Sequence, residues 1–103
     1  MDIRETVEND RIIFFVEGEI DGSNADEFED KLRDAAGRTS NLVVDLTGLE
    51  YVSSAGLRSF LMVQKQMMQQ AGQMSLVHVN DEVMEIFAVT GFVKLLNVSE
   101  EED

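Results

Sequence analysis

Two adjacent serines, Ser53 and Ser54, are the residues of this chain whose type and position could do chemistry. They follow an apolar run at residues 42–44, which predicts a buried strand, and they precede a helical pattern that continues to Gln70. The first N–H groups of a helix are unpaired and lie at the positive end of its dipole, so that position favours a cap oxygen or an anion. Ser54 could therefore be an N-cap, the commoner role for a serine, or a functional hydroxyl.

Other side chains that could support catalysis are few. His78 is the only histidine, and it falls in an apolar run that predicts a strand, so we expect it to be structural. Asp21 and Asp45 fall at the ends of expected strands and could lie near the serines, but two carboxylates without further ligands do not define a metal site. The sequence contains no P-loop, dinucleotide-binding glycine motif or nucleophile elbow. We therefore expect no enzymatic activity, no cofactor and no metal.

The composition predicts one small soluble domain. The 103 residues suffice for a single core, and the absence of cysteine excludes disulfides and thiolate metal sites. The first ten residues lack the apolar segment of a signal peptide, and no apolar run is long enough to span a bilayer. A net charge of −13 disfavours nucleic acids and anionic membranes, which bind through lysine and arginine. We expect a cytoplasmic monomer that binds neither.

The acidic residues are unevenly distributed along the chain. Residues 51–80 contain no aspartate or glutamate, and Arg58 and Lys65 are their only fixed charges. A less acidic face on an acidic protein is typical of a protein-binding surface. The alternative is a helix that simply uses glutamine on its outer side, and the sequence does not distinguish the two.

Periodicity and turn residues predict the order ββαβαβα, which implies a mixed sheet of four to five strands. Expected strands cover residues 2–7, 11–17 (ended by Gly18), 41–46 and 74–79. The first expected helix starts after Ser23 or Asn24, ends at Gly37 as a C′ residue, and buries Ala25, Phe28, Leu32, Ala35 and Ala36. The third expected helix is capped by Asn80 or Asp81, ends at Gly91, and turns Val83, Ile86, Phe87 and Thr90 inward.

The next expected helix covers residues 54–70, and Gly72 is expected to stop it. This helix has two distinct faces. Met62 is the one sizeable apolar residue on its outer face, where a methionine suits adaptable protein contacts. The opposite face is expected to be buried and contains Leu57, Phe60, Leu61, Met67, Met68 and Ala71.

Three segments carry a resemblance to a known family. They are VSSAGLR at residues 52–58, GEID at residues 18–21, and TGF with KLL at residues 90–92 and 94–96. In this order and spacing they resemble the signature of STAS domains, the anti-sigma-factor antagonist family of bacteria. The resemblance implies an α/β fold, a single STAS-like domain with helices mostly on one sheet face. Two features depart from the family pattern: many members have Asp-Ser-[ST]-Gly where this chain has Ser53-Ser54-Ala55-Gly56, so the acidic neighbour of the serine is missing, and the family often ends in a further helix, whereas this sequence ends at residues 99–103.

The resemblance also implies a function. In the family, the serine aligned with Ser54 is phosphorylated by a partner kinase, and the Asp aligned with Asp21 lines the same surface. The implied partners are an anti-sigma factor with serine-kinase activity, which the unphosphorylated protein binds to release sigma, and a PP2C-type phosphatase. One alternative is a STAS module that is never phosphorylated and serves as a subunit of a larger complex. Another is an enzyme or nucleotide-binding protein built on the same surface.

These observations together predict a partner-binding surface around the serines. It comprises the expected loop at residues 48–53, the outer face of the following helix, and the loop at residues 21–23. We expect the domain to cover residues 1–98 and an acidic tail to cover residues 99–103. The residues predicted to contact the partner are Asp21, Gly22, Ser23, Tyr51, Ser53, Ser54, Gly56, Arg58, Met62 and Lys65.

Overall fold

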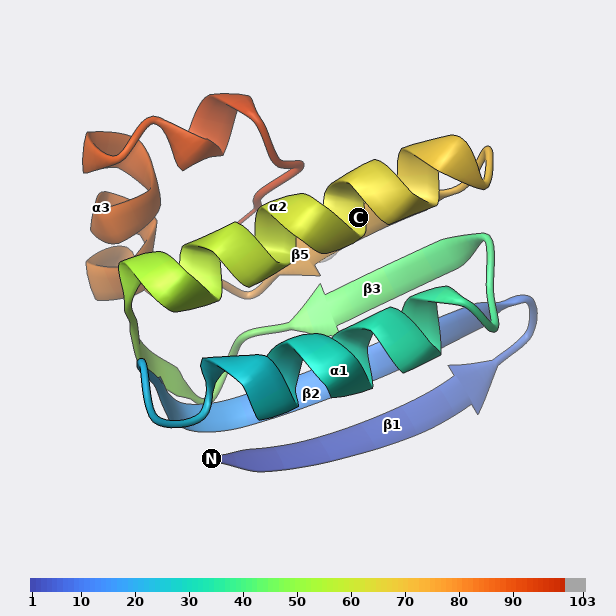
Figure 1. Cartoon of the computed structure of the whole chain (residues 1–103), viewed down its shortest axis with the longest axis horizontal. Helices are drawn as coiled ribbons and strands as arrows, with labels where there is room; N and C mark the ends of the chain where they lie inside the picture. The colour runs from blue at the N-terminus through green and yellow to red at the C-terminus, as the bar shows by residue number, and fades with distance from the viewer. Residues whose placement is uncertain (100–103) are drawn as a thin grey trace.

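A mixed sheet of five strands carries the main helices on one face (Figure 1). The structure is a computed structural model, and it describes residues 1–99. The elements in chain order are β1 (Asp2–Glu8), β2 (Arg11–Ile20), α1 (Ala25–Ala36), β3 (Asn41–Asp45), β4 (Leu49–Val52), α2 (Ser54–Gln69), β5 (Gln73–Val77), α3 (Asp81–Val89) and the short 3₁₀ helix η1 (Phe92–Lys94).

The sheet has the strand order β1-β2-β3-β5. The edge strand β1 pairs antiparallel with β2, whereas β3 and β5 continue the sheet in parallel. Strand β4 pairs in parallel with the end of β2, beyond a bulge between Gly18 and Glu19. The sequence predicted that Gly18 ends β2, and that prediction is wrong. Gly18 takes a left-handed backbone (φ 94°) at the bulge, and the strand continues to Ile20.

The core lies between the sheet and the helices. A chain of edge-to-face aromatic contacts crosses it, with ring centroids 6.2 Å apart between Phe14 and Phe28, 5.1 Å between Phe28 and Phe60, and 6.0 Å between Phe60 and Phe87. These rings connect β2 to α1, α2 and α3 in turn, and all four are fully buried. The other sheet face has only a small cluster of Ile13, Val43 and Val77 with Phe15 packed against it. The expectation of helices mostly on one face is confirmed.

The periodic pattern located the buried face of α1 but not every residue of α2 and α3. All five expected residues of α1 are buried. In α2, by contrast, Met68 is 68% exposed rather than inward, and Ala71 lies beyond the helix and is also exposed. Thr90 of the third predicted helix is exposed as well. These residues fall in or just after the last turn of their helices.

The ends of α1 and α2 are formed differently from the expectation. Gly37 is the C-cap of α1, yet its backbone is right-handed (φ −71°) rather than left-handed. After α2, Ala71 takes the left-handed conformation (φ 59°), and the N–H of Gly72 donates to the carbonyl of Met67 (2.8 Å). This is a Schellman motif with alanine at the position usually held by glycine. Gly72 is needed instead for space, because a Cβ there would lie 2.7 Å from the carbonyl oxygen of Ser40.

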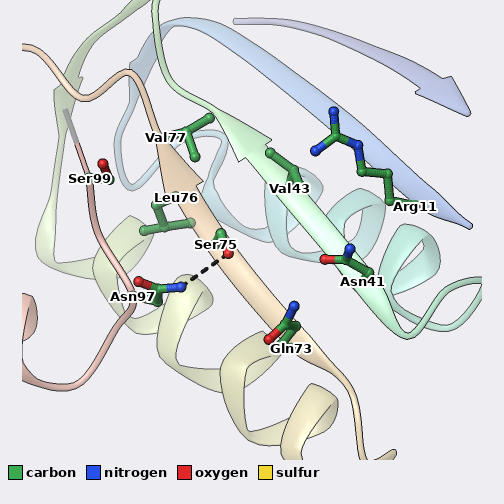
Figure 2. A pocket seen from close by; sticks show the side chains of 9 residues that line it. All are labelled: Arg11, Asn41, Val43, Gln73, Ser75, Leu76, Val77, Asn97 and Ser99. Carbon is green, nitrogen blue, oxygen red and sulfur yellow. Dashed lines mark hydrogen bonds between the residues drawn. The ribbon is translucent and has the colours of Figure 1, made fainter. Parts of the chain in front are cut away.

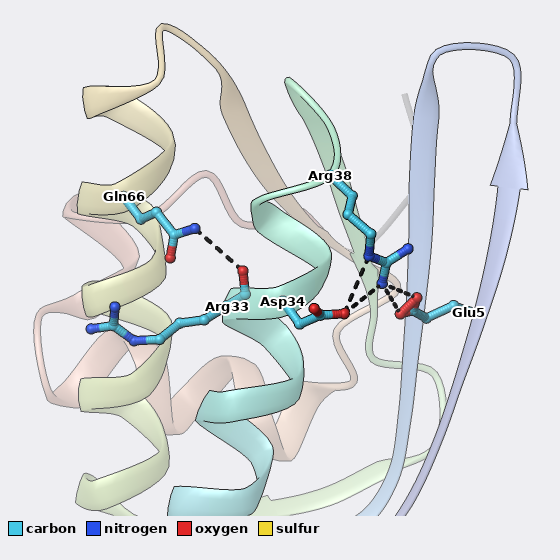
Figure 3. A network of polar contacts seen from close by, with 5 residues as sticks. All are labelled: Glu5, Arg33, Asp34, Arg38 and Gln66. Carbon is cyan, nitrogen blue, oxygen red and sulfur yellow. Dashed lines mark hydrogen bonds and ion pairs between the residues drawn. The ribbon is translucent and has the colours of Figure 1, made fainter.

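Side-chain amides of α2 bind the last carbonyls of α1. The Nε2 group of Gln66 donates to the carbonyl of Arg33 (3.2 Å; Figure 3), and that of Gln70 donates to the carbonyl of Ala36 (2.9 Å). Carbonyls at a helix C-terminus need donors and carry partial negative charge, so a carboxylate in either place would repel them. The absence of acidic residues from positions 51–80 therefore has, at Gln66 and Gln70, a structural cause.

We expect Gln70→Glu to destabilise the fold more than Gln69→Glu. Both changes add one negative charge near the end of α2, but only Gln70 contacts the carbonyl of Ala36. Losing this bond and placing a carboxylate against the carbonyl should cost about 1–2 kcal/mol more than the control. Urea unfolding of both variants measures the difference. Equal midpoints would show that the amide contact does not stabilise the packing of α1 on α2.

An ion-pair network connects the edge strand to the end of α1. The guanidinium of Arg38 contacts the carboxylates of both Glu5 and Asp34 (Figure 3). The hydrogen bonds that Arg38 donates to Glu5 raise the pKa of Arg38 above its usual value. The three side chains are partly exposed, so the network adds little to the stability of the fold.

The C-terminal part of the chain contains β5, α3 and η1, followed by a short segment that pairs with β5. As expected, Asn80 caps α3 by accepting from the N–H of Val83 (2.9 Å). Gly91, also expected just after this helix, takes a left-handed backbone (φ 81°) and separates α3 from η1. Strand β5 is shorter than the expected 74–79. Beyond η1, Val98 bridges Leu76 in parallel, and Ser99 still bonds to the Leu76 carbonyl (2.9 Å). The rest of the predicted tail, residues 100–103, lies outside the described residues.

Candidate functional site

The two serines lie where the ends of β2 and β4 meet the start of α2 (Figure 1). The N–H of Ser53 donates to the carbonyl of Ile20 (2.8 Å), which fixes Ser53 in an extended conformation. Its hydroxyl accepts from the N–H of Gly56 (3.4 Å), so Ser53 is the N-cap of α2. The possibility that Ser54 caps the helix is therefore wrong. Ser54 is the first helical residue, it is exposed, and its hydroxyl has no bonding partner among residues 1–99.

The expected loop at residues 48–53 is mostly the strand β4. Its pairing begins where the N–H of Gly18 donates to the carbonyl of Gly48 (2.9 Å). Leu49 and Val52 are buried, whereas the two residues between them, Glu50 and Tyr51, are exposed. Alternation along the sequence does not reveal such a strand, because the buried residues are three apart. The consequence for the site is that Tyr51, 46% exposed, lies on a strand that leads directly to the serines.

Gly56 is buried under the first turn of α2. A Cβ at this position would lie 2.6 Å from Cγ2 of Val52 and 2.8 Å from Cγ2 of Ile20. The absence of a side chain therefore lets the first turn of α2 approach the ends of β2 and β4. Gly56, which is predicted to contact a partner, is buried in the structure.

The loop between β2 and α1 lies at the same end of the molecule. The Oδ1 atom of Asp21 accepts from the N–H (2.9 Å) and the hydroxyl (2.6 Å) of Ser23, and these bonds lower the pKa of Asp21. Asn24 does not cap α1 with its side chain. Its Oδ1 accepts from the N–H of Asp21 (2.9 Å) and its Nδ2 donates to the carbonyl of Glu19 (3.0 Å), which holds the loop closed. Asp21, Gly22 and Ser23 are thus fixed near the serines.

The outer face of α2 continues the surface away from the serines. Arg58 and Lys65 are exposed, and Met62 is only half-buried, so it is less prominent than the sequence predicts. Lys65 lies 11 positions beyond Ser54, which corresponds to about 16 Å along a helix. Ser54, Arg58 and Lys65 therefore form an exposed strip along one side of α2.

The first turns of the helices differ in charge. Helix α1 has Asp26 and Glu27 in its first turn, and α3 has Asp81 and Glu82, whereas α2 has no acidic residue there. Carboxylates near a helix N-terminus offset the positive end of the dipole. The end of α2 that presents Ser54 is the one left without this compensation.

Asp45 and His78 lie apart from the serines. Oδ1 of Asp45 accepts from the N–H (2.9 Å) and the hydroxyl (2.6 Å) of Thr47, and its Oδ2 lies 3.9 Å from Nε2 of His78. No hydrogen bond joins Asp45 to either serine within residues 1–99, whereas Asp21 directly follows Ile20, whose carbonyl accepts from the N–H of Ser53. Nor does any group of three or more potential metal ligands occur in that part of the chain.

A cavity of about 240 Å³ opens next to β5 (Figure 2). Its polar lining includes Asn41, Ser75 and Asn97, and the amide of Asn97 donates to the Ser75 hydroxyl (3.1 Å). It is lined by neither serine of the candidate site.

No helix among the described residues is long and apolar enough to cross a membrane.

Comparisons with known proteins agree on one family. The profile of the STAS domain matches residues 3–103. The putative anti-sigma factor antagonist BtrV of Bordetella bronchiseptica is 35% identical over 89 residues, covering 85% of this chain and 77% of BtrV. The anti-sigma-B factor antagonist of Bacillus subtilis is 28% identical over 99 residues, covering 96% and 89%. The crystal structure of an anti-sigma factor antagonist from Mycobacterium paratuberculosis superposes with a TM-score of 0.85 at 20% identity, covering 95% and 84%.

Proposed function

Because this chain belongs to the STAS domain family, we propose that it is an anti-sigma-factor antagonist whose binding is switched off by phosphorylation of Ser54. The unmodified protein binds an anti-sigma factor that has serine-kinase activity, and sigma is released. A PP2C-type phosphatase returns the protein to the binding form. The names of the Bordetella and Bacillus relatives support the antagonist role.

The observation that carries the choice of Ser54 is its position at the start of α2. Its hydroxyl is exposed and has no partner among residues 1–99, whereas the hydroxyl of Ser53 is occupied by capping. In the phosphorylation step, the Oγ of Ser54 forms a bond to the γ-phosphorus of ATP. The bond to the β-phosphate oxygen breaks, ADP leaves, and the hydroxyl proton goes to a base of the kinase. The new phosphate lies at a helix end that has no carboxylate in its first turn and therefore tolerates an anion.

Phosphopeptide mapping after incubation with the cognate kinase and ATP tests the assignment. We expect the phosphate on Ser54, and we expect Ser54→Ala to abolish incorporation. Ser53→Ala is the matched control: it removes the neighbouring hydroxyl at a cost of about 1 kcal/mol in capping but leaves the acceptor in place. Phosphate found mainly on Ser53 or Ser59 would contradict the assignment. A tight complex that ATP does not change would instead favour an unphosphorylated STAS subunit.

The partner surface has its own test, in which one charge is reversed on the exposed strip of α2. We expect Arg58→Glu to weaken binding of the unmodified protein roughly tenfold or more at low salt, because the exposed guanidinium would face an acidic patch on the partner. Lys94→Glu is the control, since it makes the same charge change at an exposed residue of η1. Titration calorimetry at two salt concentrations measures both variants. Equal affinities would place the interface elsewhere.

A further inference from the structure

The arginines of this protein differ in whether they form an ion pair with an acidic side chain. Four of them contact an acidic side chain: Arg4 with Glu17, Arg11 with Glu8, Arg33 with Glu29, and Arg38 with Glu5 and Asp34. Arg58 is the exception, because its guanidinium has no ion pair or hydrogen bond within residues 1–99. The protein has a net charge of −13, and Arg58 is nevertheless an exposed arginine without an acidic partner within residues 1–99.

Arg58 is also the only basic residue within one helical turn of Ser54. The two residues are separated by four positions in α2, and both are exposed. Residues at i and i+4 lie on the same face of a helix with Cβ atoms about 5–6 Å apart. In such pairs the anion is best placed nearer the N-terminus and the cation nearer the C-terminus. A phosphate on Ser54 with Arg58 behind it has this order.

No acidic side chain of α2 competes for Arg58. The helix positions one turn away from it are Ser54, Ala55, Leu61 and Met62, and none is acidic. The first turn of α2 contains no carboxylate either. A guanidinium can donate two parallel hydrogen bonds to a phosphate, which favours pairing of a phosphate with arginine over a single point charge.

We propose that phosphate on Ser54 binds the guanidinium of Arg58 within the same molecule, so that phosphorylation withdraws this arginine from the partner surface. The proposal rests on the proposed function, which supplies the phosphate. It adds a second element to the switch. The modification introduces a bulky anion at the interface, and it also neutralises a cation that the unmodified protein offers to its partner.

The ionisation of the phosphate itself tests the pair without a partner or a kinase. Phosphoserine is installed at position 54 during translation, in the otherwise unchanged full chain and in Arg58→Gln and Lys65→Gln variants. The second ionisation of the phosphate is then followed by ³¹P NMR as a function of pH. The free group ionises with a pKa of about 6. A nearby guanidinium favours the dianion and lowers this pKa, and removing it should raise the pKa by roughly half a unit.

The Lys65→Gln variant is the matched control, because it removes an equal charge from the same helix about three turns away. We expect its phosphate to titrate as in the parent protein, and we expect Arg58→Lys to give an intermediate value. Identical pKa values for the parent and Arg58→Gln would overturn the pair. Equal upward shifts in Arg58→Gln and Lys65→Gln would also overturn it, because they would show a general field instead of a contact.

These outcomes are independent of the kinase assay. If the pair forms in the protein with installed phosphoserine but the kinase places no phosphate on Ser54, the proposed function fails and the pair stands. If the kinase modifies Ser54 but Arg58→Gln leaves the phosphate pKa unchanged, the proposed function stands and the pair fails.

Discussion

Protein phosphorylated on Ser54 is expected to bind its partner kinase about 100-fold more weakly than the unmodified form, while unfolding at nearly the same temperature. The phosphate adds a charge of about −1.5 to −2 at pH 7. The strip that it enters contains only two fixed positive charges, Arg58 and Lys65. A contact made to a neutral hydroxyl would have to desolvate this anion or leave it unpaired, and an unpaired buried charge costs about 2–5 kcal/mol of binding free energy.

The fold is expected to tolerate the same phosphate. Ser54 is exposed, and its side chain makes no hydrogen bond among residues 1–99 that the modification would break. The anion would also lie at the positive end of the α2 dipole, which stabilises charges there by about 0.3–1 kcal/mol. Loss of binding therefore should not reflect unfolding of the domain.

Thermal melting and titration calorimetry of the two forms measure these effects. Ser54→Asp and Ser54→Asn form a matched pair of variants, since they have nearly the same shape and differ in charge. We expect Ser54→Asp to weaken binding more than Ser54→Asn, although less than the phosphate does, because it has half the charge. A phosphorylated protein that melts far lower, or that binds as tightly as the unmodified form, would refute the switch.

Gly72→Ala is expected to destabilise the protein by about 2–3 kcal/mol, as overpacking against a rigid neighbour does. The added Cβ would lie 2.7 Å from the carbonyl oxygen of Ser40 and 3.1 Å from its Cα. Backbone atoms cannot rotate away as a side chain can. The same carbonyl accepts from the N–H of Gln73 (2.9 Å), so displacing it would disturb the start of the pairing between β3 and β5.

Gly22→Ala is the control for this prediction. A Cβ at Gly22 would have no neighbour within 4 Å, and its backbone is not left-handed. We expect that substitution to change stability by less than about 0.5 kcal/mol. Urea unfolding of the two variants gives the comparison. Equal stabilities would mean that the turns after α1 and α2 separate easily and that their close approach is not required.

Strand β4 and the N-cap of α2 are two features that the sequence alone did not predict. Strand β4 has four residues and an irregular burial pattern, and it exists because it pairs with the end of β2 some thirty residues earlier in the chain. The capping serine could not be chosen from residue types, because Ser53 and Ser54 are adjacent and chemically identical. The bond from the N–H of Ser53 to the carbonyl of Ile20 makes Ser53 extended and so decides where α2 begins.

What the sequence determined by itself was local or already present in the family motifs. The spacing of apolar residues predicted the buried face of α1, because burial of one helix face repeats every 3.6 residues along the chain. The motif at residues 52–58 placed Ser54 at the start of a helix and identified the family. Tertiary structure decided the features that depend on contacts between distant residues. It explained Gln66 and Gln70 through the carbonyls of α1, buried Gly56 against β2 and β4, and left Arg58 without an acidic partner among residues 1–99. Each of these depends on which backbone groups meet in space, and no periodicity in the chain records that.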